Sequence, residues 1–230
     1  MTNSSIKGKK QISSPRAATV EGEPSDFWFR AYEARTDEDY SAAAWLRAAC
    51  LCESHEIERN TEDLKRQFAE KEFFGLRKRC DVELGNNCKC ILMVKEEKNN
   101  LLSKRVVGTL GLHIRYFADG QTFPDVETTL NLKKGIMPKP SRHVERRASD
   151  RYGYILNLCV VKSERRRGHA TGMLQHAISI AKEGGIKKVF LHVYEDNEAA
   201  VKLYEKVGFK AVEAANYSSA PILLLFFLVY

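Results

Sequence analysis

Residues 157–209 read NLCVVKSERRRGHATGMLQHAISIAKEGGIKKVFLHVYEDNEAAVKLYEKVGF, and this stretch decides the fold. An apolar, β-rich run over 155–161 indicates a strand, and the charged turn 162–167 follows it directly. Apolar residues at helical spacing come next, and Gly184-Gly185 ends that pattern. A second strand through 191–193 and a further helix complete the predicted order.

The turn between the first strand and its helix is predicted to bind a phosphate-bearing ligand. The first turn of a helix presents unpaired backbone N–H groups, and the helix dipole favours negative charge there. Gly168 has no Cβ and Ala170 only a methyl, so phosphate oxygens can approach the backbone. Arg165, Arg166 and Arg167 add attraction, and an arginine can hold a phosphate through two hydrogen bonds. The spacing fits neither a P-loop nor a dinucleotide fingerprint, which leaves another pyrophosphate-bearing cofactor.

The string Arg165 to Ala170 resembles motif A of the GNAT superfamily of N-acetyltransferases, Arg/Gln-x-x-Gly-x-Gly/Ala. Leu158-Cys159-Val160 stands where that family has a Leu-x-Val strand end, and residues 203–209 match its later Leu-Tyr-x-x-x-Gly-Phe motif. The resemblance implies acetyl-CoA as donor and an amine as acceptor. It also implies an α/β fold with a single mixed sheet, flanked by helices and splayed at its centre between two parallel strands to admit the cofactor.

The same resemblance assigns roles to individual residues. Tyr204 resembles the family's general acid, which protonates the sulfur of CoA. Backbone N–H groups of Cys159 and Val160 would polarise the thioester carbonyl, and the amide of Asn197 would anchor the cofactor or the helix that follows it. The full set implied to bind the cofactor is Leu158, Cys159, Val160, Arg165, Arg166, Arg167, Gly168, His169, Ala170, Thr171, Asn197 and Tyr204.

The motif does not identify the general base. His192 lies in the second predicted strand and can accept a proton near neutral pH, directly or through a water. Glu195 and His169 are weaker candidates. Structural roles stay open for the two proposed catalytic residues, because His192 can equally be a hydrogen-bonded strand histidine and Tyr204 a core aromatic.

Composition indicates one globular domain, residues 26–230, behind a disordered basic tail. The 230-residue chain is 43% apolar, which suits a single domain with a substantial core. Residues 1–20 contain three lysines, one arginine, four serines and no acid, as at the end of an organellar transit peptide. This favours the plastid stroma, with the cytoplasm as the alternative. The terminal run PILLLFFLVY has ten residues, fewer than the ~20 of a membrane span, and is predicted to be a buried last strand.

Neither a metal nor a nucleic acid is expected as a partner. The six cysteines lack CxxC spacing and are predicted to be free thiols. The net charge of +7 includes four positive charges in the tail, so the remainder carries only +3 (seven minus four). The chain also lacks the aromatic and basic pattern of an RNA-binding motif.

The first half of the chain is predicted to supply the remaining elements in the order typical of acetyltransferases. We expect a strand over 26–35, a helix capped by Asp37, and a second helix over 62–76. Strands over 88–94 and 106–116 follow, and Cys88 and Cys90 share one face of the first of these. Residues from about 118 to 150 are predicted to form an inserted loop.

The acceptor is the least determined part. Asn216-Tyr217 resembles the start of the Asn-Tyr-Tyr string of N-terminal acetyltransferases, although Ser218 replaces the second tyrosine. The chain most resembles the plant plastid acetyltransferases, which implies protein N-termini and lysine side chains as acceptors. An arylalkylamine such as serotonin is the alternative. A non-catalytic acyl-CoA-binding module is a further hypothesis, against which Tyr204 argues. The oligomeric state is left open.

Overall fold

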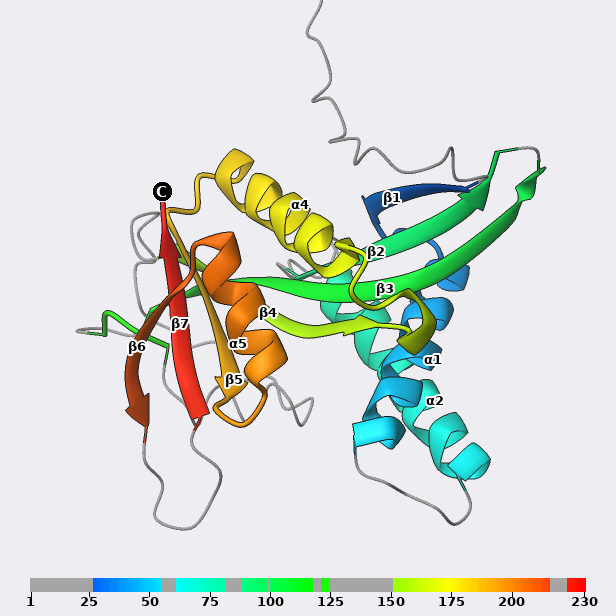
Figure 1. The fold of residues 1–230 in the computed structure, drawn as a ribbon, viewed down its shortest axis with the longest axis horizontal. Coiled ribbons are helices and arrows are strands. Elements are labelled where there is room, and N and C mark those ends of the chain that lie inside the picture. The colour runs from blue at the N-terminus through cyan, green and yellow to red at the C-terminus, as the bar shows by residue number, and fades with distance from the viewer. Residues whose placement is uncertain are drawn as a thin grey trace, which may run out of the picture.

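The computed structural model describes residues 27–54, 61–81, 88–98, 100–117, 121–124, 151–215 and 223–230. In chain order the elements are β1 (Phe27–Glu33), α1 (Asp37–Ser54), α2 (Thr61–Cys80), β2 (Cys88–Glu97), β3 (Asn100–Tyr116), β4 (Arg151–Val160), the 3-10 turn η2 (Lys162–Glu164), α4 (His169–Glu183), β5 (Lys188–Tyr194), α5 (Glu198–Val207), β6 (Lys210–Ala215) and β7 (Leu223–Val229). The strands form one sheet in the order β1-β2-β3-β4-β5-β7-β6, with helices against it (Figure 1). The predicted fold class is confirmed.

Three predictions fall wholly or largely outside the described residues. They concern the tail 1–25, the inserted loop 118–150 apart from residues 121–124, and Asn216-Tyr217. These stay predictions.

The sheet divides at its centre. Strands β1 to β4 pair antiparallel with their neighbours, as do β5, β7 and β6. Strands β4 and β5 run parallel, and they pair over three positions, from Gly153 opposite Val189 to Ile155 opposite Leu191. Beyond that point the two strands diverge (Figure 1). The predicted splay between two parallel strands is therefore present.

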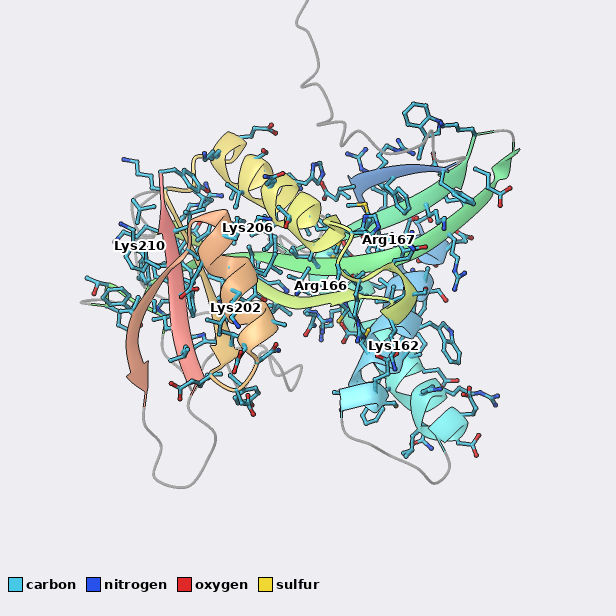
Figure 2. All side chains as sticks on the ribbon, viewed as in Figure 1. Lys162, Arg166, Arg167, Lys202, Lys206 and Lys210 are labelled. Carbon is cyan, nitrogen blue, oxygen red and sulfur yellow. The ribbon has the colours of Figure 1, made fainter. Side chains whose placement is uncertain are left out.

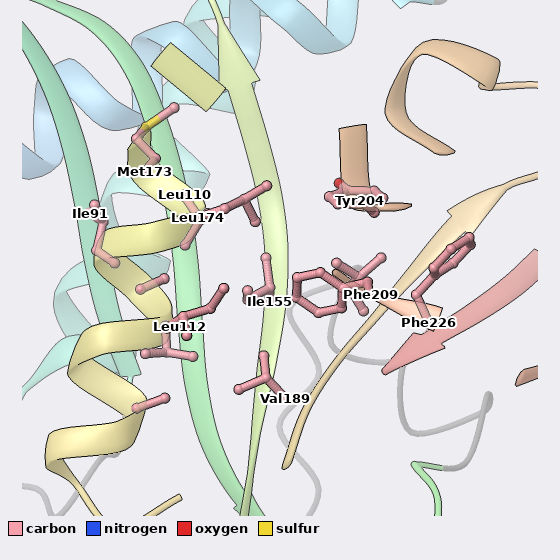
Figure 3. Close-up of a cluster of buried hydrophobic side chains, with 14 of the residues drawn as sticks. Ile91, Leu110, Leu112, Ile155, Met173, Leu174, Val189, Tyr204, Phe209 and Phe226 are labelled. Atoms are coloured by element: carbon pink, nitrogen blue, oxygen red, sulfur yellow. The ribbon is translucent and has the colours of Figure 1, made fainter. Parts of the chain in front are cut away.

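Helices cover both faces of the sheet, which explains why residues 90–94 of β2 are an uninterrupted apolar run. On one face, Ile91 and Met93 of β2 belong to the cluster that includes Met173 and Leu174 of α4 (Figure 3). On the other face, Cys90 and Leu92 pack with Ala43, Ala44 and Leu76 from α1 and α2. Cys88 and Cys90 share this second face, as the alternation predicted.

Several predicted boundaries were wrong by a few residues. Helix α2 continues to Cys80, because Leu76 and Cys80 both reach the core and the basic last turn suits a helix C-terminus. Strands β2, β3 and β4 are longer than predicted, since the β2–β3 hairpin extends to Glu97 opposite Asn100 and β4 starts at Arg151.

The cap of α1 also differs from the prediction, which gave it to Asp37. Thr36 Oγ1 accepts a hydrogen bond from the backbone N–H of Asp39 at 3.2 Å. The Asp39 carboxylate accepts one in return from the N–H of Thr36 at 3.4 Å. This reciprocal pair is a capping box with Thr36 as its first residue.

Candidate active site

A cleft of about 1380 Å³ opens where β4 and β5 diverge. Its walls come from the end of β4, the turn into α4, the end of β5, α5, and the facing sides of α1 and α2. Every residue predicted to bind the cofactor lines this cleft except Arg167, and His192 lines it as well. Residues that lie far apart in sequence are thus brought together at one place.

A β-bulge in β4 marks the start of the splay. Leu156 pairs with Gly111 and Cys159 with Thr109, so Asn157 and Leu158 stand opposite the single residue Leu110. Asn157 has a φ of 53°, a left-handed conformation that asparagine tolerates better than most residues. Beyond Ile155 the edge of β4 that faces β5 has no strand partner among the described residues. The bulge could not be predicted from the sequence, because an asparagine within an apolar strand is compatible with regular pairing as well as with a bulge.

The turn before α4 has the form expected of an anion site. Gly168 has a φ of 84°, and a Cβ built on it would meet no atom of the protein within 4 Å. The helix starts at His169, and no side chain caps its first turn. The first N–H groups and the helix dipole are therefore available to a phosphate, and the space over Gly168 admits its oxygens.

The three arginines of the turn have different surroundings. Arg165 donates from Nε to the carbonyl of Val160 at 3.0 Å and from its guanidinium to Glu53 at 2.6 Å. Arg167 forms an ion pair with Glu164 at 3.2 Å. Arg166 is exposed at the cleft wall. Unlike Arg165 and Arg167, its side chain forms no hydrogen bond or ion pair with another described residue, so among the three it is the one that can turn to a ligand in the cleft without breaking such a contact.

Two lysines of α5 face the turn across the cleft. Lys202 and Lys206 line it together with Arg166, and Figure 2 shows these labelled side chains on the two sides of the gap between α5 and the turn. Lys202 also pairs with Glu198 at 3.0 Å, but both side chains are largely exposed. The cleft mouth is consequently positive, which suits a ligand with several phosphates.

A buried carboxylate organises the turn, and the sequence did not indicate it. Glu164 is 7% exposed and accepts a hydrogen bond from Lys95 at 2.9 Å, while Arg167 and His169 lie within 4 Å of its second oxygen. The hydrogen bond from Lys95 is the main reason why the pKa of Glu164 lies below its ordinary value. His169 also packs its ring on Phe29 at 4.3 Å. Within a run of charged residues, sequence alone does not reveal which member is buried.

Tyr204 lies on the α4 face of the sheet. It is 8% exposed and packs near Phe209 and Phe226, with ring centroids 6.0 and 6.2 Å away. Burial, with a contribution from Cys159, raises the pKa of Tyr204 to about 12. The core-aromatic role and the cleft-facing role are therefore both fulfilled by this one side chain.

His192 lies on the opposite face of the sheet. It alternates along β5 with Leu191 and Val193, which belong to the α4-side core. Its Nδ1 is 2.8 Å from the hydroxyl of Tyr154 on β4, so this hydrogen bond crosses the base of the splay. The two residues predicted to act in catalysis thus approach the cleft from different faces of the sheet.

The remaining predicted residues divide clearly. Asn197 accepts a hydrogen bond from the N–H of Ala200 at 3.2 Å and so caps α5, which is the helix-anchoring alternative of its two predicted roles. Glu195 is exposed and does not line the cleft.

A buried charge network forms part of the α1/α2 wall. Glu72 Oε1 accepts hydrogen bonds from Arg47 at 2.7 Å and from Arg79 at 2.8 Å. Arg47 also donates to Thr109 of β3 at 3.1 Å. All three charged residues line the cleft, and together they tie α1, α2 and the sheet. The network could not be predicted from the sequence, because its charged members are separated by up to 32 positions along two helices of mixed charge.

These features fit a CoA thioester. Gly168 and the first turn of α4 can hold a pyrophosphate, the basic residues at the mouth can hold further phosphate, and the unpaired edge of β4 can bind an extended amide-bearing arm. Among the described residues, no group of three or more His, Cys, Asp or Glu side chains is arranged to hold a metal ion. In that same part of the chain, no helix is both long and apolar enough to span a membrane.

Comparison with known proteins agrees with this geometry. The sequence profile of the acetyltransferase (GNAT) family matches residues 48–209. The chain is 43% identical over 194 residues to the Arabidopsis thaliana protein named GCN5-related N-acetyltransferase 6, chloroplastic; the match covers 83% of this chain and 65% of that relative. It is 39% identical over 66 residues to N-alpha-acetyltransferase 50 of Danio rerio, covering 28% of this chain and 39% of the relative.

Structural comparison gives the same fold. A chain from the NatC complex bound to Gag peptide and CoA superposes with a TM-score of 0.53 at 15% identity, covering 89% of this chain and 99% of that chain. The protein belongs to the acetyltransferase (GNAT) family. The predicted family, whose members are acyltransferases that use acetyl-CoA as donor, is thereby confirmed.

Proposed function

We propose that this protein transfers the acetyl group of acetyl-CoA to amino groups of proteins, at N-termini, at lysine side chains or at both. The observation that carries this proposal is the exposed apolar wall on the α1/α2 side of the cleft. Leu51 and Phe68 line the cleft and are 39% and 38% exposed. Such a wall suits a segment of a longer chain, whereas an arylalkylamine needs a pocket that encloses its ring. Similarity to an enzyme named N-alpha-acetyltransferase supports the N-terminal α-amine.

The turn and α5 would hold the donor. Backbone N–H groups after Gly168 bind the pyrophosphate, and Arg166, Lys202 and Lys206 supply positive charge at the mouth. Acetyl-CoA, when bound, supplies the acetyl group as an activated thioester. The exposed edge of β4 aligns the arm of the donor through backbone hydrogen bonds.

Val160 is the better placed of the two proposed oxyanion donors. Val161 donates its N–H to Val107 of β3 at 2.9 Å, so the backbone groups of Val160, one residue earlier, point to the opposite edge of the strand. The contact between Arg165 and the carbonyl of Val160 agrees with that direction. By the same alternation Cys159 directs its N–H towards β3. We therefore assign polarisation of the acyl carbonyl to the N–H of Val160.

Tyr204 would act on the leaving sulfur as a hydrogen-bond donor. Its pKa of about 12 exceeds that of an ordinary thiol, about 8.5, by about 3.5 units. Complete proton transfer from Tyr204 to a thiolate would then be unfavourable by about 5 kcal/mol. A hydrogen bond from its hydroxyl still stabilises charge that develops on sulfur. This sharpens the role of general acid into that of a hydrogen-bond donor.

His192 is the proposed base, and its contact with Tyr154 fixes what this requires. If the Tyr154 hydroxyl accepted a hydrogen bond from Nδ1–H, the second ring nitrogen, Nε2, would be the proton acceptor. If the hydroxyl donated to Nδ1, a neutral ring would carry its hydrogen on Nε2 and could not accept there. The proposal therefore specifies the first tautomer, with Tyr154 as the residue that orients the ring.

Acceptor class can be tested directly. The protein is incubated with acetyl-CoA and either a peptide library, containing free N-termini and lysines, or serotonin, and the products are identified by mass spectrometry. We expect acetylated peptides, with the position of the acetyl group separating α-amine from ε-amine transfer. Acetylation of serotonin with no modified peptide would overturn the choice of acceptor. Neither product, in the presence of measurable CoA binding, would indicate a binding module.

We also propose a plastid location. It rests on the name of the 43% identical relative, which is called chloroplastic, and on the basic composition of residues 1–20. A fluorescent protein fused behind the whole chain should accumulate in plastids. Deletion of residues 1–25 should leave it in the cytoplasm. Cytoplasmic fluorescence from the full chain would contradict the proposal.

A further inference from the structure

Two of the six cysteines meet at the cleft. Cys50 on α1 and Cys159 on β4 both line it and are both partly exposed. The other four cysteines, Cys52, Cys80, Cys88 and Cys90, are buried. Reagents in the cleft can therefore reach one pair of thiols. One of the pair lies on α1, which belongs to the α1/α2 wall of the cleft, and the other lies on β4, next to Val160.

The two thiols affect each other's acidity. Both line the same cleft, and the influence of each thiol on the other is the main reason why the pKa of Cys50 is lowered to about 7 and that of Cys159 is raised. Burial and the charge of Glu53 oppose the shift at Cys50, while Arg165 assists it. Arg165 is itself fixed by its bonds to Glu53 and to the carbonyl of Val160. The arrangement makes Cys50 the stronger acid and places a second thiol beside it.

Reactivity follows from this arrangement. Because its pKa is lowered to about 7, Cys50 is thiolate to a larger extent at neutral pH than an ordinary thiol of pKa about 8.5. The thiolate is the species that attacks a disulfide. Cys159, which is held in its protonated form, is the neighbouring thiol that can resolve a mixed disulfide.

We propose that Cys50 and Cys159 form a reversible disulfide that switches acetyl transfer off, with a soluble or protein disulfide as the oxidant. The Cys50 thiolate attacks one sulfur of the oxidant, forms a mixed disulfide and releases one thiolate. The Cys159 thiol then loses its proton and attacks Cys50 sulfur, which releases the second thiolate. The protein gives up two electrons and two protons in all, and one disulfide is reduced to two thiols.

The bridge would act on the site through its position. A disulfide joins its two sulfurs at about 2.05 Å and constrains the Cα atoms to about 4.4–6.8 Å. It would tie α1 to β4 and fix the residue that directly precedes Val160. Because precise placement of the reacting groups is required for transfer, the oxidised protein is expected to lose activity while remaining folded.

A rival pair lies elsewhere in the molecule. The sulfurs of Cys80 and Cys88 are 3.2 Å apart, and Cys88 also contacts His113 at 3.1 Å. Both cysteines are buried in the α1/α2 core, so a dissolved oxidant reaches them only when the structure opens. Peptide mapping separates the two possibilities.

The test uses the full chain and oxidised glutathione. Reduced protein is exposed to the oxidant at pH 7, and samples are quenched by acid and alkylated. We expect a species lighter by two hydrogen atoms, with the new disulfide mapped to Cys50 and Cys159. Acetyl transfer should fall by about tenfold or more, as for other disruptions of a catalytic geometry, and return on addition of a reductant. Mass and mapping report the bridge whether or not a protein is the acceptor.

Matched variants decide the assignment. Cys50→Ser and Cys50→Ala should each remove the sensitivity, when each variant is compared with its own reduced form. Cys52→Ser, which changes a buried cysteine on the same helix, should leave the sensitivity unchanged. Desulfo-CoA, which occupies the donor site without a thiol, should slow formation of the bridge. A disulfide mapped to Cys80 and Cys88, equal sensitivity in Cys50→Ser, or full activity in the bridged protein would each overturn the proposal.

Discussion

Replacing Gly168 by alanine separates the role of the turn before α4 in folding from its proposed role in binding CoA. In the protein alone a methyl group at this position meets nothing within 4 Å, so the substitution causes no steric clash. The backbone there has a φ of 84°, which an alanine adopts only with strain. In the complex, that same methyl would occupy the space over the first N–H groups of α4, where the phosphate is expected. Folding and binding should therefore respond to different extents.

Both effects can be given a size. A left-handed conformation costs a non-glycine residue about 1–2 kcal/mol, which for a chain of this length lowers Tm by about 2–8 °C. A hydrogen bond to a charged group contributes about 1.5–3 kcal/mol. Losing one such bond to the pyrophosphate raises the Kd for CoA by about tenfold to hundredfold.

Gly185 provides the matched control. It lies just past the other end of α4, has a φ of 73°, and likewise has no atom within 4 Å of a Cβ position. Gly185→Ala should therefore lower Tm by a similar amount but leave CoA affinity unchanged, because Gly185 does not line the cleft. Calorimetric titration with CoA and thermal unfolding of both variants give the comparison. Unaltered CoA affinity in Gly168→Ala, or equal losses in the two variants, would refute the assignment of the turn.

Three further predictions concern the reaction and the fold. Tyr204→Phe should lower kcat by about a hundredfold or more, with CoA affinity nearly intact. In the unsubstituted protein the pH-rate profile between pH 6 and 10 should show no limb from Tyr204, because its pKa of about 12 keeps it protonated there. A Tyr204→Phe variant with an unchanged rate would remove Tyr204 from the mechanism. His192→Gln should abolish the acidic limb of the profile of kcat/KM against pH. His176→Gln, which changes a histidine outside the cleft lining, should retain that limb. Parallel pH profiles in the two variants would exclude His192 as the base. Glu72→Gln should lower the free energy of unfolding in urea by about 3 kcal/mol, because two buried arginines lose their counter-charge. Glu198→Gln, at the exposed ion pair with Lys202, should lower it by less than about 0.5 kcal/mol. Burial raises the pKa of Glu72 but its two arginines outweigh that effect, so this stabilisation is present at neutral pH and is lost as the pH falls through the lowered pKa; equal losses in the two glutamine variants would contradict this account.

Local signals in the sequence were sufficient to predict the form of the turn before α4. The turn around Gly168 depends on neighbours in sequence: a strand end, a residue without a Cβ and a helix start. Motif A, the strand end before it and the Tyr204 motif together span one short stretch. Element boundaries were less well predicted, because the ends of α2 and β3 are set by the core and by the partner strand.

What could not be predicted depends on contacts between distant segments. The Arg47 network requires α1, α2 and β3 to meet, and the burial of Glu164 requires Lys95 of β2 to reach it. Cys50 and Cys159, which line the same cleft, are more than a hundred positions apart. Periodicity in the sequence identifies the apolar face of a helix or strand. It does not identify which polar residues will be buried against a polar partner from another element.

The two strands that border the cleft, β4 and β5, are each held by a different neighbouring strand, and this explains how the cleft can stay open before any ligand binds. On one side, Cys159 and Val160 of β4 pair with Thr109 and Gly108 of β3. On the other, β5 pairs with β7 along its whole length, from Lys188 to Tyr194. Closing the gap would break one of these ladders, and the bulge at Asn157 already turns β4 out of register with β5. Under the proposed function, donor and acceptor enter a gap that the fold holds open, so little ordering free energy has to be supplied when they bind.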